Sequence, residues 1–269
     1  MIEEVVMEFA VNHIVSPKQP LDAFFSMARS LGLTGVEIRN DLEGAPIQDG
    51  TSPAAVKEAA KNAGVKILSI NALYPFNVWT PELANKARIL ADYAAACGAR
   101  ALIMCPLNEG KKVDFSETVT ALGNIKPILQ DRGLIGLVEP LGFPISSLRT
   151  KAAAVRAIEA ADGTGTYNLV HDTFHHHLAG EEAFFASRTG LVHISGVSDP
   201  SVAVSNMLDD HRVLVNADDR LGNLAQISRL LSDGFAGPFS FEPFSPEVQS
   251  LADPEAALRE SMTFIRQHL

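Results

Sequence analysis

The chain has 269 residues, of which 46% are hydrophobic, and a formal net charge of −10 at pH 7. This length suits one large core, and the acidic charge opposes binding to a nucleic-acid phosphate backbone. Residues 1–4 are acidic where a signal peptide is basic, and no apolar run approaches the roughly 18 residues of a membrane span. We therefore expect a cytoplasmic protein that binds neither nucleic acid nor membrane.

A pattern of helical stretch, glycine and short apolar run repeats along the chain. The glycines are Gly32, Gly64, Gly98, Gly133, Gly190 and Gly234. A glycine in this place is typical of a left-handed helix cap. The predicted strands span residues 8–13, 35–39, 65–71, 101–105, 134–139, 167–172, 191–197 and 239–244, and helices are predicted at residues 81–97, 115–132, 148–161 and 254–268.

Eight apolar strands with a rhythm of about 30 residues are typical of successive βα units. We therefore predict a single (β/α)8 TIM barrel domain spanning residues 1–269. A doubly wound open sheet is the alternative, because local periodicity does not show closure, but the chain has no glycine-rich dinucleotide motif. The two cysteines, Cys97 and Cys105, fall in a helix and a strand, where we expect small buried residues rather than a disulfide.

Four of these strands end on a side chain that can bind a metal. The four residues are Glu139, Asp172, His193 and Glu242. Any one of them alone could cap a helix or face water, but in a parallel barrel all four strand ends meet at one face. Three carboxylates and one imidazole suit one divalent cation, with Mn²⁺ as the first choice and Mg²⁺, Co²⁺ or Zn²⁺ as alternatives.

Such a site suits a substrate that carries a carbonyl beside a hydroxyl. The cation can bind both oxygens and stabilise the enediolate that forms when a proton leaves carbon. A carboxylate on either side then moves the proton. We therefore expect a small-molecule polyol ketone or ketose as substrate.

Further polar residues are predicted at the same mouth. His13 (with Asn12), Arg39 and Asn71 end the first three strands, where they either contact substrate or fix the loops. His175, three residues after Asp172, is placed to donate to a substrate oxygen. The rest of the run 175–177 is expected to include surface residues, and His171 is expected to face barrel or helix.

The segment 199–223 is the longest irregular connection, as is common for lids and binding loops. It contains Arg212 among acidic neighbours. Arg212 either pairs with these acids or contacts substrate, and we favour the substrate contact.

Five motifs resemble the sugar isomerase and epimerase family with a xylose-isomerase-like barrel. They are Gly35-Val36-Glu37-Ile38-Arg39, Val138-Glu139-Pro140, Asp172-Thr173-Phe174-His175, Val192-His193-Ile194-Ser195 and Ser240-Phe241-Glu242-Pro243. The resemblance implies that Glu139, Asp172, His193 and Glu242 bind the cation. It also implies that Glu139 and Glu242 are the acid/base pair and that His175 contacts substrate. Many relatives carry an arginine shortly after the strand-seven histidine, whereas this chain has none before Arg212.

The segments 9–13, 37–41, 138–143 and 170–177 further resemble bacterial 2-keto-myo-inositol (inosose) isomerases. We therefore expect an inosose isomerase of inositol catabolism. The alternatives are a ketose 3-epimerase or hydroxypyruvate isomerase, then an inosose dehydratase, an endonuclease-IV-like phosphodiesterase or a sugar-binding protein without activity. The family also suggests a homo-oligomer.

Overall fold

The computed structural model describes residues 7–269 and contains a closed barrel of eight parallel strands in the order β1 to β8. The strands are β1 (Phe9–Asn12), β2 (Gly35–Arg39), β3 (Lys66–Leu73), β4 (Ala101–Met104), β5 (Ile135–Val138), β6 (Tyr167–Asp172), β7 (Thr189–Ile194) and β8 (Phe239–Phe241). β1 pairs with β8, which closes the barrel. The predicted (β/α)8 barrel is therefore confirmed, and the open sheet is wrong.

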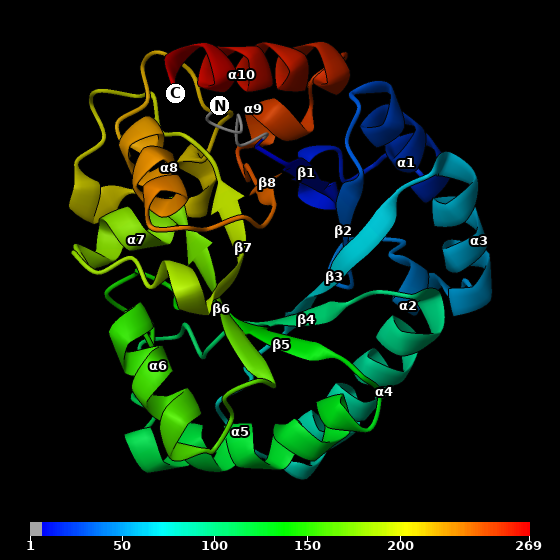
Figure 1. The fold of residues 1–269 in the computed structure, drawn as a ribbon, viewed down its shortest axis with the longest axis vertical. Coiled ribbons are helices and arrows are strands. Elements are labelled where there is room, and N and C mark those ends of the chain that lie inside the picture. The colour runs from blue at the N-terminus through cyan, green and yellow to red at the C-terminus, as the bar shows by residue number, and fades with distance from the viewer. Residues whose placement is uncertain (1–6) are drawn as a thin grey trace.

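Helices form a ring around the strands (Figure 1). They are α1 (Leu21–Ser30), α2 (Pro46–Asp49), α3 (Pro53–Ala63), α4 (Pro81–Cys97), α5 (Phe115–Gln130), α6 (Lys151–Ala160), α7 (Thr173–Ala179), α8 (Asn223–Ser232), α9 (Pro246–Gln249) and α10 (Pro254–His268). Short 3-10 turns lie at His13–Val15, Ala186–Arg188, Val204–Asn206 and Asp209–His211. Among residues 7–269, no helix is long and apolar enough to cross a membrane.

Local sequence explains where several helices begin and end. The side chains of Ser52 and Thr80 accept hydrogen bonds from the first turns of α3 and α4, each with proline at the next position. Gly64 and Gly98 end the same two helices with φ of 72° and 83°. The prediction for Gly190 is wrong, because this glycine lies within β7, where the side chain of Leu137 leaves no room for a Cβ.

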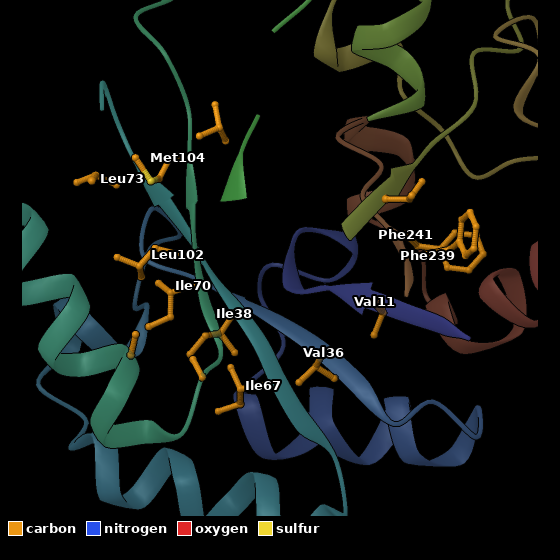
Figure 2. Packing of buried hydrophobic residues seen from close by; sticks show 14 of the residues in the cluster. Val11, Val36, Ile38, Ile67, Ile70, Leu73, Leu102, Met104, Phe239 and Phe241 are labelled. Carbon is orange, nitrogen blue, oxygen red and sulfur yellow. The ribbon is translucent and has the colours of Figure 1, made fainter. Parts of the chain in front are cut away.

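Along each strand, side chains point alternately into the barrel and toward the helices. Figure 2 shows Val36 and Ile38 of β2 and Ile67 and Ile70 of β3 on the helix side. An apolar cluster from the other strand faces fills part of the barrel, namely Ala101, Ile103, Leu137, Val170 and Leu191. The polar strand-end residues continue these inward faces. The interior is therefore apolar along the strands and polar at their carboxyl ends.

Two predicted boundaries differ in ways that affect the site. His13 lies outside β1, in the 3-10 turn, because the side chain of Asn12 accepts a hydrogen bond from the Ile14 N–H and turns the chain. β7 ends at Ile194, and the connection to α8 contains a bridge between Gly196 and Val213. This bridge returns the long connection to the barrel mouth.

Candidate metal and substrate site

Glu139, Asp172, His193 and Glu242 form a buried group, here called the carboxylate–histidine cluster. One ligand atom from each residue lies within 4.8 Å of the others. The Nδ1 atom of His193 lies 2.9 Å from Glu139 Oε1, 3.1 Å from Glu242 Oε2 and 3.9 Å from Asp172 Oδ2. The structure therefore brings together all four residues predicted as metal ligands.

Register explains how four distant segments meet. Asp172 pairs with His193 across β6 and β7, and Glu139 and Glu242 each follow directly the last paired residues of their strands. The backbone N–H of Glu242 donates to Ile194 of β7 at 2.9 Å, and that of Glu139 donates to Met104 of β4 at 3.0 Å. These bonds fix the height of both glutamates at the barrel mouth.

Glu37 lies behind the imidazole of His193 and was not among the predicted site residues. Its two carboxylate oxygens lie 3.1 and 3.2 Å from His193 Nε2. Ser69 and Ser240 donate hydroxyl hydrogen bonds to it at 2.6 and 2.5 Å. A carboxylate on Nε2 leaves Nδ1 turned toward the other three acids, which is the usual arrangement behind a metal-binding histidine. The sequence did carry a signal for Glu37, because it lies two residues before Arg39 and therefore on the same face of the strand.

The charge of His193 follows from its neighbours. Burial lowers its pKa, but the fields of Glu242, Glu37 and Glu139 outweigh burial and hold the pKa well above the ordinary value. Without a cation, the imidazolium is the positive charge at the centre of these acids. A metal ion bound at Nδ1 would replace that proton.

Glu242 is surrounded by hydrogen-bond donors. Its Oε1 accepts from Asn12 and Asn71, each at 3.1 Å, and from Arg39 at 3.0 Å. Burial raises the pKa of Glu242, but His193, Arg212 and Arg39 outweigh burial and lower the pKa far below its usual range. Arg39 and Asn71, both predicted to contact substrate, therefore hold this carboxylate.

Arg212 reaches the cluster from the connection after β7. Its Nη2 donates to Asp172 Oδ2 at 2.6 Å and to Glu242 Oε2 at 3.2 Å, and its Nη1 donates to Asp209 at 3.2 Å. The guanidinium is buried over the rings of Phe174 and Phe244. Arg212 therefore pairs with its acidic neighbour and also enters the site, so both predicted roles of this residue are compatible.

Asp172 joins the cluster to α7. Its Oδ1 accepts from the backbone N–H groups of Phe174 at 2.8 Å and His175 at 3.1 Å, which leaves Oδ2 facing the cluster. The run 175–177 lies in this helix. His175 is buried, and its backbone is fixed relative to Asp172.

One predicted site residue, His13, lies away from the cluster, and one residue that was not predicted there, Cys105, contacts it. His13 Nε2 pairs with the Gln19 carbonyl at 2.8 Å, and its ring stacks on Phe24 of α1. Within residues 7–269, no hydrogen bond joins His13 to the cluster. Cys105 was not predicted at the site, but its thiol donates to Glu139 Oε2 at 3.4 Å. Burial and the nearby Glu139 raise the Cys105 pKa, so it stays a thiol.

The four-residue cluster fits a divalent cation. Its hard oxygens and one imidazole suit Mn²⁺, Mg²⁺, Co²⁺ or Zn²⁺, and all four residues are buried. Buried carboxylates this close repel one another unless positive charge separates them. A cation at His193 Nδ1 would supply that charge.

The fold and site define a parallel barrel with a metal-capable acidic cluster at the carboxyl ends of its strands. Residues 25–268 match the xylose isomerase-like TIM barrel family, and the chain belongs to this family. No curated protein matches the sequence.

Solved structures cover nearly the whole chain. A xylose isomerase domain-containing protein from Salmonella typhimurium LT2 is 35% identical, with a TM-score of 0.91 over 97% of this chain and 98% of that one. The IolI protein, solved with a bound zinc atom, is 21% identical, with a TM-score of 0.84 over 98% and 99%. D-allulose 3-epimerase from Methylomonas sp. is 17% identical, with a TM-score of 0.75 over 98% and 97%. The last two show the shared fold.

Proposed function

We propose that the protein is a divalent-metal-dependent isomerase of a small uncharged polyol ketone, with 2-keto-myo-inositol (inosose) as the first candidate substrate. The observation that carries the proposal is the buried carboxylate–histidine cluster at the ends of β5 to β8. Mn²⁺ is our first choice of cation. When bound, the cation supplies Lewis-acid stabilisation of the negative charge that develops on substrate oxygens.

The two glutamates of the cluster differ in their hydrogen-bond donors. Glu242 accepts four N–H hydrogen bonds, three on Oε1 and one on Oε2, which stabilise its charged form. Glu139 Oε2 has the weak thiol of Cys105 as its side-chain donor. Glu139 has fewer hydrogen-bond donors, with His193 Nδ1 at 2.9 Å from its Oε1, and we propose that it removes the proton from the carbon beside the ketone. Glu242 is the proposed acid/base group on the opposite face of the enediolate.

The charges of the site favour an uncharged substrate. Four buried carboxylates, including Glu37, are balanced by the guanidiniums of Arg39 and Arg212 together with a divalent cation. All three nitrogens of each guanidinium already donate to protein oxygens. A substrate carboxylate or phosphate would find no unpaired guanidinium in this described site. This supports an inosose or a ketose over hydroxypyruvate.

Donors for substrate hydroxyls surround the cluster. We propose Arg39, Asn71, His175 and Arg212 for this role, because each guanidinium keeps at least one N–H group that no oxygen of the described residues accepts. A cleft of about 600 Å³, lined by Asp41, Ala72 and Tyr74 among others, opens beside the Arg39–Asp41 pair. Its size is in the range of small-molecule sites, and its lining mixes polar and apolar residues, none of them from the carboxylate–histidine cluster.

Solvent deuterium exchange tests the proposal. Metal-stripped protein, with and without added Mn²⁺, is mixed with scyllo-inosose, fructose or hydroxypyruvate and followed by proton NMR. The proposal is supported if deuterium exchanges into inosose only when the metal and Glu139 are present. The same exchange should persist in the surface variant Glu109→Gln. Reaction with fructose alone would replace inosose by a ketose as substrate, and a change at carbon 3 would identify an epimerase. Absence of exchange with all three would contradict the proposed reaction.

A further inference from the structure

A buried polar network lies on the helix side of β6, behind the cluster. Lys151, the first residue of α6, is 3% exposed. Its Nζ lies 2.8 Å from the Nδ1 atom of His171 and 2.8 Å from the Nδ1 atom of His176. Burial lowers the pKa of Lys151 to about 7, so the ammonium form prevails below that pH. In this form both rings must present lone pairs, because each would otherwise direct a proton at the ammonium.

Gln226 fixes the tautomer of His171. The Gln226 amide nitrogen donates to the carbonyls of Thr173 at 3.1 Å and Leu221 at 2.9 Å. Its oxygen therefore accepts the hydrogen bond from His171 Nε2 at 2.9 Å. His171 Nδ1 then has a free lone pair for Lys151. The two imidazoles occupy two of the three N–H groups of the Lys151 ammonium.

The third N–H group of Lys151 has no hydrogen-bond acceptor among residues 7–269, although Nζ lies 5.5 Å from the centroid of the Phe184 ring. The nearest carboxylate oxygen, Glu181 Oε2, is 4.0 Å from Nζ, which is too far for a direct hydrogen bond. Glu181 is itself fixed, because it accepts from the backbone N–H groups of Lys151 at 2.9 Å and Ala152 at 2.8 Å. The carboxylate is therefore not free to close the gap.

A small cavity of about 10 Å³ occupies this region. Its lining includes Lys151, His175, Ala179 and Glu181. This volume is about that needed by one water molecule, and buried waters make about three hydrogen bonds. Lys151 and Glu181 offer a donor and an acceptor.

His175 offers the third partner. His175 lines the same cavity, is 4% exposed, and packs its ring edge-on against Phe143 and Phe174. Its Nδ1 atom is buried and has no hydrogen-bond partner among residues 7–269. A buried polar atom without a hydrogen-bond partner is unfavourable, so this nitrogen needs a partner.

We propose that one buried water molecule in this cavity accepts a hydrogen bond from Lys151 and donates to Glu181 and to His175 Nδ1. The water makes three hydrogen bonds and satisfies all three groups. Because Nδ1 of His175 then accepts, the ring proton lies on Nε2. Lys151 is thus a positioning residue that acts through the water on His175.

The tautomer matters for substrate recognition, and this step rests on the proposed function. A ketone oxygen is only an acceptor, so it requires the Nε2–H form of His175. The other neutral tautomer would present a lone pair to that oxygen and repel it. The cavity therefore selects the tautomer of His175 that binds a carbonyl.

Two direct observations test the water and the tautomer without any substrate. A high-resolution crystal structure of the full chain is expected to show water density within hydrogen-bonding distance of Lys151, Glu181 and His175. Nitrogen-15 NMR of the histidine rings is expected to show His175 protonated on Nε2 alone. A cavity without water, or a proton on Nδ1 of His175, would overturn the proposal even if isomerase activity were found. Conversely, a substrate other than inosose would leave both observations unchanged.

Variants of Ala179, which lines the cavity, distinguish the effect of losing the water from the effect of disturbing the fold. Ala179→Val fills the cavity while Lys151 keeps its two histidine partners, and Ala179→Gly keeps the space. We expect Ala179→Val to lose the water and the single tautomer and to lower kcat by about tenfold, as is common for partners behind a site. Ala179→Gly is expected to retain the water, the tautomer and kcat. The proposal would be contradicted if crystals of Ala179→Val lack the water while the nitrogen-15 NMR spectrum of His175 in this variant stays unchanged.

Discussion

The Nε2 atom of His193 lies 3.1 Å from Glu37 Oε1, so the imidazole is held between one carboxylate behind it and the three acids of the cluster. Ser69 and Ser240 fix that carboxylate in turn. The ring cannot turn without breaking these bonds. Glu37 therefore determines which nitrogen of His193 faces the proposed cation.

Replacing Glu37 tests this role. Glu37→Gln keeps the size and an acceptor oxygen but removes the charge that stabilises the Nε2–H group. We expect Mn²⁺ affinity to fall by about 10- to 100-fold, measured by competition with a chromophoric chelator. Glu43→Gln, an exposed change, is the control. Equal affinity in Glu37→Gln and the control would show that Glu37 does not support the metal ligand.

Arg212 and the proposed cation neutralise the same oxygens. Arg212→Met leaves Asp172 and Glu242 without their guanidinium, and breaking such a buried pair costs about 3–5 kcal/mol. We expect the metal-free variant to melt lower than the wild type. Added Mn²⁺ is expected to raise its melting temperature more than that of the wild type, because the cation replaces the lost charge.

Differential scanning calorimetry with chelator and with Mn²⁺ measures both effects. Arg220→Met is the matched control, since Arg220 lies in the same connection but donates to the Val202 carbonyl. Its metal-induced shift is expected to equal that of the wild type. A shift in Arg212→Met no larger than in Arg220→Met would refute the shared role.

The barrel was predictable because its signals are local. Each unit carries its own apolar run, most of these runs follow a glycine, and strand ends such as Glu139 and Asp172 can be counted without a three-dimensional structure. Closure by β1 and β8 is a long-range pairing, but eight units of similar length allow few other arrangements.

The supporting residues were harder to predict because register decides them. Glu37 lies in the middle of β2, where no strand end marks it, and it reaches a histidine 156 residues away. Arg212 has acidic neighbours in sequence, yet its strongest partner is Asp172, 40 residues earlier. His13 was misplaced for a local reason, because Asn12 ends the strand before it. Side-chain pairs across the barrel are thus the part that sequence patterns do not reveal.

The acid stability of the protein depends on the network around Lys151. Burial, then the charge of Lys151, lowers the pKa of His176 to about 3, from 6.5. The unfolded chain therefore binds a proton at this site as the pH falls through 6.5, whereas the folded protein does so only near 3. Stability from the neutral imidazole is present above about pH 6.5 and is lost as the pH falls toward 3.

The variant His176→Gln keeps an acceptor for Lys151 but does not titrate. We expect its free energy of unfolding to change less between pH 7 and about pH 5 than that of the wild type, as measured by urea denaturation. His268→Gln removes an exposed imidazole of α10 and is the control. Parallel pH curves for His176→Gln and the wild type would contradict the assignment.

Gly142 gives α7 its close approach to the loop after β5. A Cβ at Gly142 would lie 2.2 Å from the His175 carbonyl oxygen and 3.0 Å from the Ala179 backbone nitrogen. Both atoms are backbone, so Gly142→Ala would have to displace the helix that carries His175. We expect a loss of about 1–3 kcal/mol in stability, typical of overpacking, and a fall in activity with the substrate identified by deuterium exchange.

Gly123→Ala is the informative control. Gly123 lies within α5, and a Cβ there would meet no atom within 4 Å among the described residues. Alanine in a helix interior is favoured over glycine by roughly 0.5–1 kcal/mol, so Gly123→Ala is expected to stabilise the protein and leave activity unchanged. If Gly142 is required for the close contact, urea denaturation shows a lower free energy of unfolding for Gly142→Ala and a higher one for Gly123→Ala. If Gly142→Ala were also stabilising, α7 would have room to move, and its fixed position relative to the cluster would be wrong.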